Sequence, residues 1–147
     1  MNKNPPFSTS FTVQATPQKV FDAINHVRGW WSGQITGPTD ELGREFVYRY
    51  EDRHRSHQKV TELVPGKKVT WEVTEASLSF PNPGEWNGTR IEFELREAAG
   101  GTQVRFTHHG LLPACQCYAD CSGAWTFFVT ESLPKFILTG KGAEFAP

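Results

Sequence analysis

The sequence lacks a strong excess of charge of either sign. Its 147 residues include 15 Lys and Arg and 16 Asp and Glu, which gives a formal net charge of −1 at pH 7. Nucleic acids and anionic membrane surfaces attract clustered Lys and Arg, so this balance argues against both as main partners. A chain of this length is expected to form a single domain over residues 1–147. We therefore expect a globular domain with no nucleic-acid partner.

Long hydrophobic runs are also missing. No segment approaches the roughly 20 apolar residues that a membrane-spanning helix requires. The first residues, MNKNPPFSTSF, contain no apolar stretch typical of a secretory signal peptide. These two absences predict no membrane span and a cytoplasmic location.

Cysteine is scarce, and all three cysteines lie close together at Cys115, Cys117 and Cys121. This C-x-C-x₃-C spacing differs from the paired ligands of zinc sites, and even with His108 it supplies at most three ligands. Cys115 and Cys117 are too close for an unstrained disulfide, and Cys117 and Cys121 are poorly aimed at each other in a helix. We therefore expect no metal site, no cofactor and three free thiols in a reducing compartment.

Aromatic residues, in contrast, are abundant, with five Trp, eleven Phe and three Tyr. Such side chains bury large areas, and they can either fill an ordinary core or form the walls of a cavity. Trp30 and Trp31 are adjacent, and neighbouring helical residues point about 100° apart. One of the two is therefore expected in the core and the other at an opening, whereas Trp86 is expected as a lid or a plug.

The first part of the chain predicts a strand at 10–15 and two short helices within 16–31. Thr16 is a suitable N-cap, Pro17 fits the first helical position, and Gly29 is expected to separate the two helices. Residues 44–109 then alternate between apolar and polar, which is typical of about five or six antiparallel strands with one solvent-facing side. Within 57–64, Val60 and Leu63 have opposite parity, and a β-bulge would reconcile them.

The last part of the chain, about 116–139, predicts one long amphipathic helix. Its apolar residues recur every three or four positions and form one stripe. Pro134 lies inside this segment, so we expect a kink about one turn earlier, near Thr130. The only element long enough to cover the inner face of the sheet is this helix. A gap is expected where the sheet curls away from it.

This order of elements resembles the START-like, or SRPBCC, superfamily, in the branch named after the activator of the heat-shock ATPase. The matching strings include FTVQATPQKVFDAI at 11–24, VTELVPGKKVTWEV at 60–73, GTQVRFTHHGL at 101–111 and CYADCSGAW at 117–125. The resemblance implies an α+β helix-grip fold. In that fold, a curved antiparallel sheet of about six or seven strands wraps a long C-terminal helix, with two short helices after the first strand.

Three hypotheses for function follow. The first is a protein that binds an apolar small molecule, such as a lipid, polyketide or aromatic compound, between the sheet and the helix. Its expected ligand-binding residues face inward by parity or lie on the helical stripe: Trp31, Phe46, Tyr48, Trp71, Trp86, Phe93, Phe106, His108, Tyr118, Cys121, Trp125 and Phe128. Polar contacts are expected from His108, Tyr48 and Tyr118, whereas His54 and His109 are expected in solvent.

The second hypothesis is an enzyme of the cyclase or hydrolase kind, with His108 as the general acid–base. A thiol nucleophile at Cys121 paired with His108 is a variant of it, although Cys121 also fits as a small packed side chain. The third hypothesis, which the resemblance alone implies, is a module that contacts a chaperone through a surface patch. A homodimer is compatible with each of the three.

Overall fold

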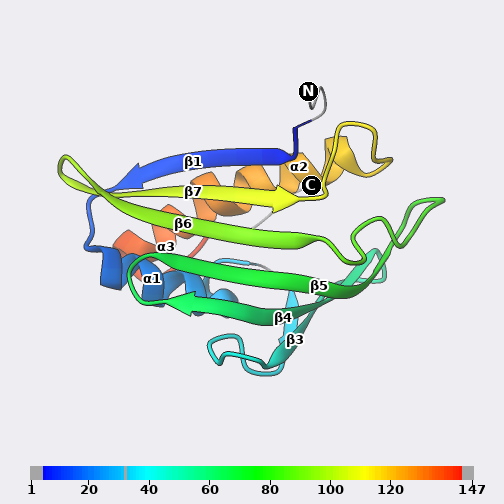
Figure 1. Ribbon diagram of the computed structural model, residues 1–147, viewed down its shortest axis with the longest axis horizontal. Helices are drawn as coiled ribbons and strands as arrows, with labels where there is room; N and C mark the ends of the chain where they lie inside the picture. The colour runs from blue at the N-terminus through cyan, green and yellow to red at the C-terminus, as the bar shows by residue number, and fades with distance from the viewer. Residues whose placement is uncertain (1–4, 32, 144–147) are drawn as a thin grey trace.

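The computed structural model describes residues 5–31 and 33–143, and they form one seven-stranded antiparallel sheet and one long C-terminal helix (Figure 1). The strands lie in the order β1-β7-β6-β5-β4-β3-β2. Their bounds are β1 (Phe7–Val13), β2 (Gln34–Thr36), β3 (Glu45–Tyr50), β4 (His54–Val64), β5 (Lys68–Leu78), β6 (Arg90–Ala98) and β7 (Gly101–His109). The helical elements are α1 (Pro17–Asn25), η1 (Val27–Gly29), α2 (Tyr118–Phe127), η2 (Phe128–Ser132) and α3 (Leu133–Thr139).

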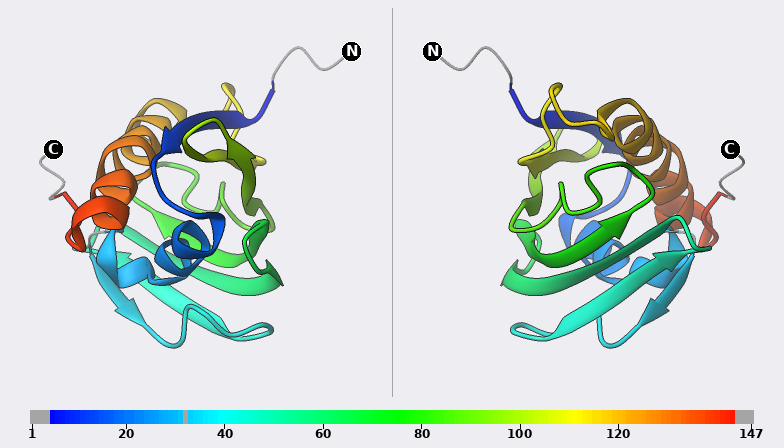
Figure 2. Two further views of the ribbon diagram at one scale, coloured as in Figure 1. Left: turned by 90° about the vertical axis from the view of Figure 1, so that its left-hand side faces the viewer. Right: turned by 90° about the vertical axis from the view of Figure 1, so that its right-hand side faces the viewer.

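The sheet bends around the C-terminal helix, and the two end-on views show this curvature (Figure 2). The elements α2, η2 and α3 follow one another without a break and cover the inner face of the sheet. The helix α1 lies on the same side, next to α3 and against β5, β6 and β7. The α+β helix-grip fold expected from the sequence is therefore confirmed.

Alternation along the strands sets which residues form the core. Ile91 and Phe93 of β6 and Val104 and Phe106 of β7 are fully buried, as their parity predicted. Phe93 lies opposite Phe106 across the two strands, so the inward side chains of neighbouring strands pack as pairs.

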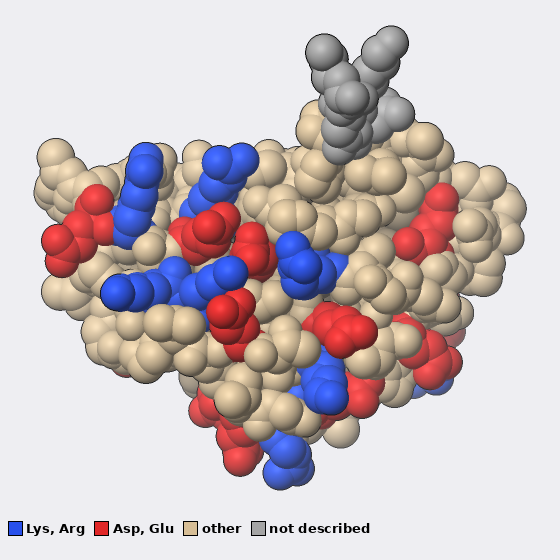
Figure 3. All heavy atoms as spheres, viewed as in Figure 1, with Lys and Arg blue, Asp and Glu red and all other residues tan. Residues whose placement is uncertain are grey.

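The opposite face of the sheet carries charges of both signs. The outward residues of β6 are two arginines and two glutamates, and Lys68 on β5 pairs with Glu62 and Glu92 on the neighbouring strands, at 3.2 and 3.1 Å. Figure 3 shows basic and acidic side chains interspersed over this face. Within the described ranges, no helix is both long and apolar enough to cross a membrane.

A bulge resolves the facing of β4, as expected. Val60 lies opposite Trp71 and Glu62 lies opposite Thr70, so Thr61 is an extra residue with no partner position on β5. The extra residue reverses the parity, and both Val60 and Leu63 turn toward the apolar side, with Val60 fully buried and Leu63 half-buried.

The segment after β1 contains one α-helix and one short 3₁₀ turn. The Thr16 hydroxyl accepts a 3.2 Å hydrogen bond from the Lys19 N–H, and Pro17 occupies the first helical position, as expected. The break between the two helical pieces falls at His26 rather than at Gly29, which is instead the last residue of η1. The backbone of His26 leaves the helical region there, with φ −86° and ψ 65°.

The C-terminal helix has a π turn where a kink was expected. At Phe128–Ser132 it widens into a π turn, directly before Pro134. Proline has no N–H to donate and its ring crowds the carbonyl four residues earlier, here that of Thr130. A wider turn accommodates this defect while the helix continues to Thr139.

Candidate functional site

A cleft of about 620 Å³ opens between α2 and the neighbouring ends of β3, β4 and β5. Its lining is mostly aromatic and apolar, with a few polar groups: Trp31, Tyr48, Tyr50, Arg53, His54, Leu78, Ser79, Phe80, Trp86, Ala119, Asp120, Cys121, Gly123, Ala124, Trp125 and Phe128. A second hollow, of about 490 Å³, lies against α1 and holds several charged side chains but no tryptophan. The first cleft is therefore the stronger candidate for an apolar ligand.

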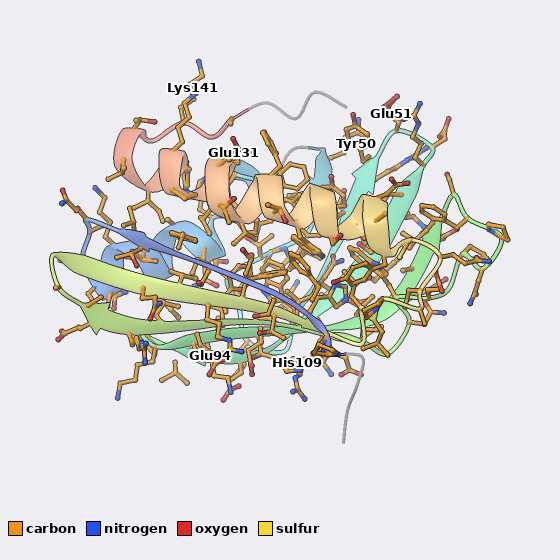
Figure 4. All side chains as sticks on the ribbon, turned by 90° about the horizontal axis from the view of Figure 1, so that it is seen from above. Tyr50, Glu51, Glu94, His109, Glu131 and Lys141 are labelled. Carbon is orange, nitrogen blue, oxygen red and sulfur yellow. The ribbon has the colours of Figure 1, made fainter. Side chains whose placement is uncertain are left out.

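Tyr50, which lines this cleft, lies toward one end of the molecule in the side-chain view (Figure 4). Tyr50 and Glu51 lie where β3 ends, on the side of the N-terminal half of the long helix. Glu94 and His109 point away from the outer face of the sheet, and Glu131 and Lys141 point away from the outer face of the helix. Charged residues thus mark the outside of both layers, and the aromatic side chains lie between them.

Three tryptophans from different parts of the chain form the wall of the cleft. Trp31 stacks on Tyr48, with ring centroids 3.8 Å apart and planes 12° apart, and lies 4.9 Å from Trp125. Trp86 lies parallel to Trp125 at 5.8 Å. Behind this wall Trp30 is in the core, where its indole N–H donates to the Ile24 carbonyl at 3.1 Å. Trp31 is buried as well, and its ring stacks on that of Trp30 with centroids 6.3 Å apart, so the two rings do not face opposite sides as expected. Of the two, Trp31 lines the cleft.

The structure divides the twelve expected ligand-binding residues into two equal groups. Six line the cleft: Trp31, Tyr48, Trp86, Cys121, Trp125 and Phe128. The other six, Phe46, Trp71, Phe93, Phe106, His108 and Tyr118, lie outside its lining. The first five of these are fully buried, and Tyr118 is half-buried with its ring 6.5 Å from that of Phe7. Inward parity alone did not separate residues that fill the core from residues that border an opening.

His108 is fully buried, and both of its ring nitrogens are hydrogen bonded. The Trp125 indole N–H donates to Nδ1 at 3.1 Å, so the proton of the neutral ring is on Nε2. That Nε2–H donates to the Thr89 hydroxyl at 2.8 Å, and Thr89 in turn donates to the Trp86 carbonyl at 2.7 Å. The chain of donors and acceptors is complete, and it links β7, the 79–89 loop and α2.

Burial lowers the pKa of His108 to about 3, and the nearby His109 and His54 add to this lowering. The ring is therefore neutral at pH 7, and no nitrogen of it is left to exchange a proton with a molecule in the cleft. The hydrogen bonds of His108 serve to hold two walls of the cleft together.

His54 differs from the expectation of a solvent-exposed side chain in a charged turn. It is the first residue of β4, is half-buried and lines the cleft. Its Nε2 lies 3.0 Å from the Ser56 hydroxyl, which also accepts a hydrogen bond from Gln58. Ser56 and Gln58 are fully buried. The alternation that places His54, Ser56 and Gln58 on one face of the strand could have predicted that His54 points inward. The charged residues on either side of it favoured a solvent-exposed turn instead.

Burial also changes the acid–base properties of two titratable rings that border the cleft, His54 and Tyr48. The pKa of His54 is lowered to about 4 by burial, so this ring is neutral at pH 7. Burial raises the pKa of Tyr48, and the neighbouring Tyr50 adds to this rise. His54 and Tyr48 are therefore uncharged at pH 7, whereas Arg53 carries a positive charge at the rim.

The thiols lie at the start of α2. Cys117 is fully buried, and Cys121, one turn later, lines the cleft. The hydrogen bond between them lowers the pKa of Cys117 and, together with burial, raises that of Cys121. The Glu85 carboxylate accepts from the N–H groups of Gln116 and Cys117, at 2.9 and 3.2 Å. Within the described part of the chain, no three His, Cys, Asp or Glu side chains gather as a metal site.

A curved sheet that wraps a C-terminal helix and leaves an aromatic cleft at one end defines the START-like, or SRPBCC, class of protein. The family model described as "Activator of Hsp90 ATPase homolog 1-like protein" matches residues 14–137, and the chain belongs to this family. In the comparison with curated proteins, no protein matches the sequence.

Solved structures show the same fold. The Aha1 dimer from Colwellia psychrerythraea is 29% identical, with a TM-score of 0.74 over 92% of this chain and 98% of that chain. DynU16, a protein of the dynemicin biosynthetic locus, is 18% identical, with a TM-score of 0.70 over 94% of this chain and 49% of that chain. CalU16 from Micromonospora echinospora is 13% identical, with a TM-score of 0.63 over 90% and 74%.

Proposed function

We propose that this protein binds an apolar small molecule, of lipid, polyketide or aromatic type, in the cleft between α2 and the β3–β5 end of the sheet. The observation that supports this most directly is the aromatic lining of a space of about 620 Å³. Ligand pockets of proteins span about 300–1,000 Å³ and are mostly apolar with a few placed polar groups.

The proposed binding depends on burial of apolar surface. Each Å² of apolar surface that a ligand loses to Trp31, Trp86, Trp125 and Phe128 contributes about 25 cal/mol. The rings already pack on one another, so a ligand finds walls that are largely formed before it binds. These rings are 2–3% exposed, so a flat molecule would contact the parts of them that their mutual packing leaves uncovered.

The proposal involves no covalent chemistry. General acid–base catalysis needs a titratable group within hydrogen-bond reach of the substrate. Both nitrogens of His108 are hydrogen bonded within the protein, and the pKa of this ring is lowered to about 3. The geometry of His108 therefore supports a binding protein over a cyclase or hydrolase that uses this residue.

A ligand screen tests the proposal. The melting temperature and the tryptophan fluorescence are measured with a panel of fatty acids, flavonoids and aromatic polyketides. We expect at least one class to raise the melting temperature and to quench the fluorescence, because three of the five tryptophans border the cleft. No response from any class would refute the proposal.

Two matched variants test whether the ligand binds in this cleft. Gly123 lines the cleft on α2, and a Cβ added there meets no atom within 4 Å. Gly123→Phe is therefore expected to fold and to occupy part of the cleft, which weakens binding of the best compound. Thr126→Phe places the same ring at an exposed position of α2 outside the lining and is expected to leave binding unchanged. Equal affinities of the two variants would contradict the assignment of the cleft.

A further inference from the structure

The rim of the cleft carries two opposite charges, which differ in how far other groups of the protein compensate them. Arg53 lies on the turn between β3 and β4, and Asp120 lies across the cleft in the first turn of α2. Within residues 5–31 and 33–143, no carboxylate forms an ion pair with Arg53. The nearby Arg49, on β3, is paired with Asp52 at 2.9 Å. Arg53 is thus the basic group that the turn leaves available to the cleft.

The backbone of Arg53 is anchored even though its side chain is exposed. The Arg53 carbonyl accepts hydrogen bonds from both the N–H and the hydroxyl of Ser79, each at 3.0 Å, and its N–H donates to the Tyr50 carbonyl at 3.2 Å. Three hydrogen bonds therefore hold the origin of this side chain at the rim, between the ends of β3 and β5. A guanidinium placed in this way offers a planar fork that matches a carboxylate.

Asp120 is held by a different interaction. It lies in the first turn of α2, where the partial positive charge of the helix N-terminus stabilises a carboxylate. Its charge is therefore partly compensated within the protein, whereas the charge of Arg53 is not. The balance of the rim favours a negatively charged ligand group over a positively charged one.

His54 supplies a second donor close to Arg53. The Ser56 hydroxyl accepts a hydrogen bond from Gln58, and its one hydrogen is free to donate to Nε2 of His54, 3.0 Å away. In the tautomer of neutral His54 that accepts this hydrogen, the proton is on Nδ1, and Nδ1 has no hydrogen-bond partner among the described residues. The wall next to Arg53 thus offers an uncharged N–H that suits a carboxylate or phenolate oxygen.

We propose that the cleft selects flat apolar molecules that carry an acidic group, a carboxylate or a phenolate, with the acidic oxygens on Arg53 and His54 and the rings against Trp31, Trp86 and Trp125. This inference rests on the proposed function and specifies its ligand class. The apolar body supplies burial, and the acidic group determines which end of the molecule faces the rim.

Three probes of one shape and different charge test the inference: 2-naphthoate, 2-naphthalenemethanol and 2-naphthylmethylammonium. Their dissociation constants are measured at pH 7 and low salt by quenching of tryptophan fluorescence. Hydrogen bonds to charged groups are stronger than neutral ones, so we expect 2-naphthoate to bind about tenfold more tightly than the alcohol and the cation to bind most weakly. Arg53→Gln is expected to remove most of this tenfold preference.

Arg49→Gln is the matched control, since it removes a nearby arginine of β3 that is already paired and lies outside the lining. It is expected to keep the preference for the anion. Equal affinity for anion and alcohol in the wild type, or an Arg53→Gln variant that keeps the preference, overturns this inference alone. Failure of all three probes, together with a silent ligand screen, overturns the proposed function and this inference together.

Discussion

The indole nitrogen of Trp125 donates a 3.1 Å hydrogen bond to Nδ1 of His108, and this contact joins the C-terminal helix to the last strand of the sheet. Both side chains are buried, so neither has water as an alternative partner. Trp125 also faces the cleft, whereas His108 lies behind it. The bond therefore holds a residue of the cleft wall in place from the core side.

Trp125→Phe is expected to lower the free energy of unfolding by more than the loss of ring volume alone. The substitution leaves Nδ1 of His108 buried and without a donor, which costs about 1–3 kcal/mol. Urea unfolding followed by circular dichroism measures this loss.

Trp71→Phe is the control for this prediction. Trp71 is equally buried, but its indole nitrogen has no hydrogen-bond partner among the described residues. The same change of ring there removes volume without breaking a hydrogen bond, so Trp125→Phe should cost about 1 kcal/mol more than Trp71→Phe. Equal losses would show that the Trp125–His108 bond contributes nothing to stability.

Stability is expected to fall as the pH drops below about 6.5. His108 has a pKa of about 3 in the folded protein and 6.5 as its ordinary value, so between these limits the unfolded chain binds more protons. The contribution of His108 is fully present above pH 6.5 and is lost at up to about 1.4 kcal/mol per pH unit as the pH decreases towards 3. His54 adds to this slope in the same direction, down to about pH 4. Urea unfolding at a series of pH values measures the slope.

His108→Gln removes one of these two groups and is expected to flatten the slope, whatever its effect on absolute stability. His109→Gln changes the next residue on β7, which faces the outer side and lies 3.2 Å from Glu92. It is expected to keep most of the wild-type slope. If His108→Gln has the same slope as the wild type, the burial of a neutral ring at this position does not govern the acid sensitivity.

Gly123→Ala is expected to raise the free energy of unfolding by about 0.5–1 kcal/mol. Glycine in the interior of a helix costs about this much relative to alanine, and the added Cβ at position 123 meets no atom within 4 Å. Chemical denaturation measures the gain.

Gly101→Ala is the contrasting variant. A Cβ at that position would lie 2.0 Å from the Val13 carbonyl oxygen on the neighbouring strand, and a backbone atom cannot move aside cheaply. We expect a loss of about 1–3 kcal/mol, typical of overpacking. A stabilising effect of this variant would contradict the close approach of β1 and β7 at this end of the sheet.

The three thiols are expected to differ in reactivity in the native protein. Cys115 is half-buried, Cys117 is fully buried, and the pKa of Cys121 is raised by its hydrogen bond with Cys117 and by burial. Alkylation needs an accessible thiolate, so iodoacetamide at pH 8 should modify Cys115 first and leave Cys117 unmodified. Mass spectrometry after proteolysis identifies the modified residue.

Unfolding in urea should abolish these differences and allow all three cysteines to react. Rapid labelling of Cys117 in the native protein would mean that the start of α2 opens readily, contrary to its burial in the structure.

The secondary structure and its faces could be predicted because they depend on local pattern. Alternation over 90–98 and 101–109 defined two strands and their inner faces, and the parity conflict at Val60 and Leu63 predicted a bulge. The C-terminal stripe predicted the long helix. The sequence predicted an irregularity in the helix before Pro134 but not its form, because a kink and a π turn both relieve the same clash.

The candidate site was accessible only in part. Six of the twelve expected residues border the cleft. Alternation along a strand predicts which side chains point inward, but it does not predict which of them lie in the core and which lie at the cleft. His54 was placed in solvent because its neighbours are charged, although its side chain follows the inward parity of Ser56 and Gln58. Arg53 was not predicted as a site residue, because its place at the rim depends on the ends of β3 and β5, which only the fold brings together.

By itself the sequence determined the order of the elements, the side of each strand that is apolar and the aromatic character of the interior, because these follow from the spacing of residues along the chain. Only the tertiary structure decided which aromatic rings fill the core and which face an opening. Phe93 and Trp86 have similar chemistry, but one is enclosed by neighbouring strands and the other lies where the curved sheet and the helix separate. That difference arises from close packing among distant segments, which no local period encodes.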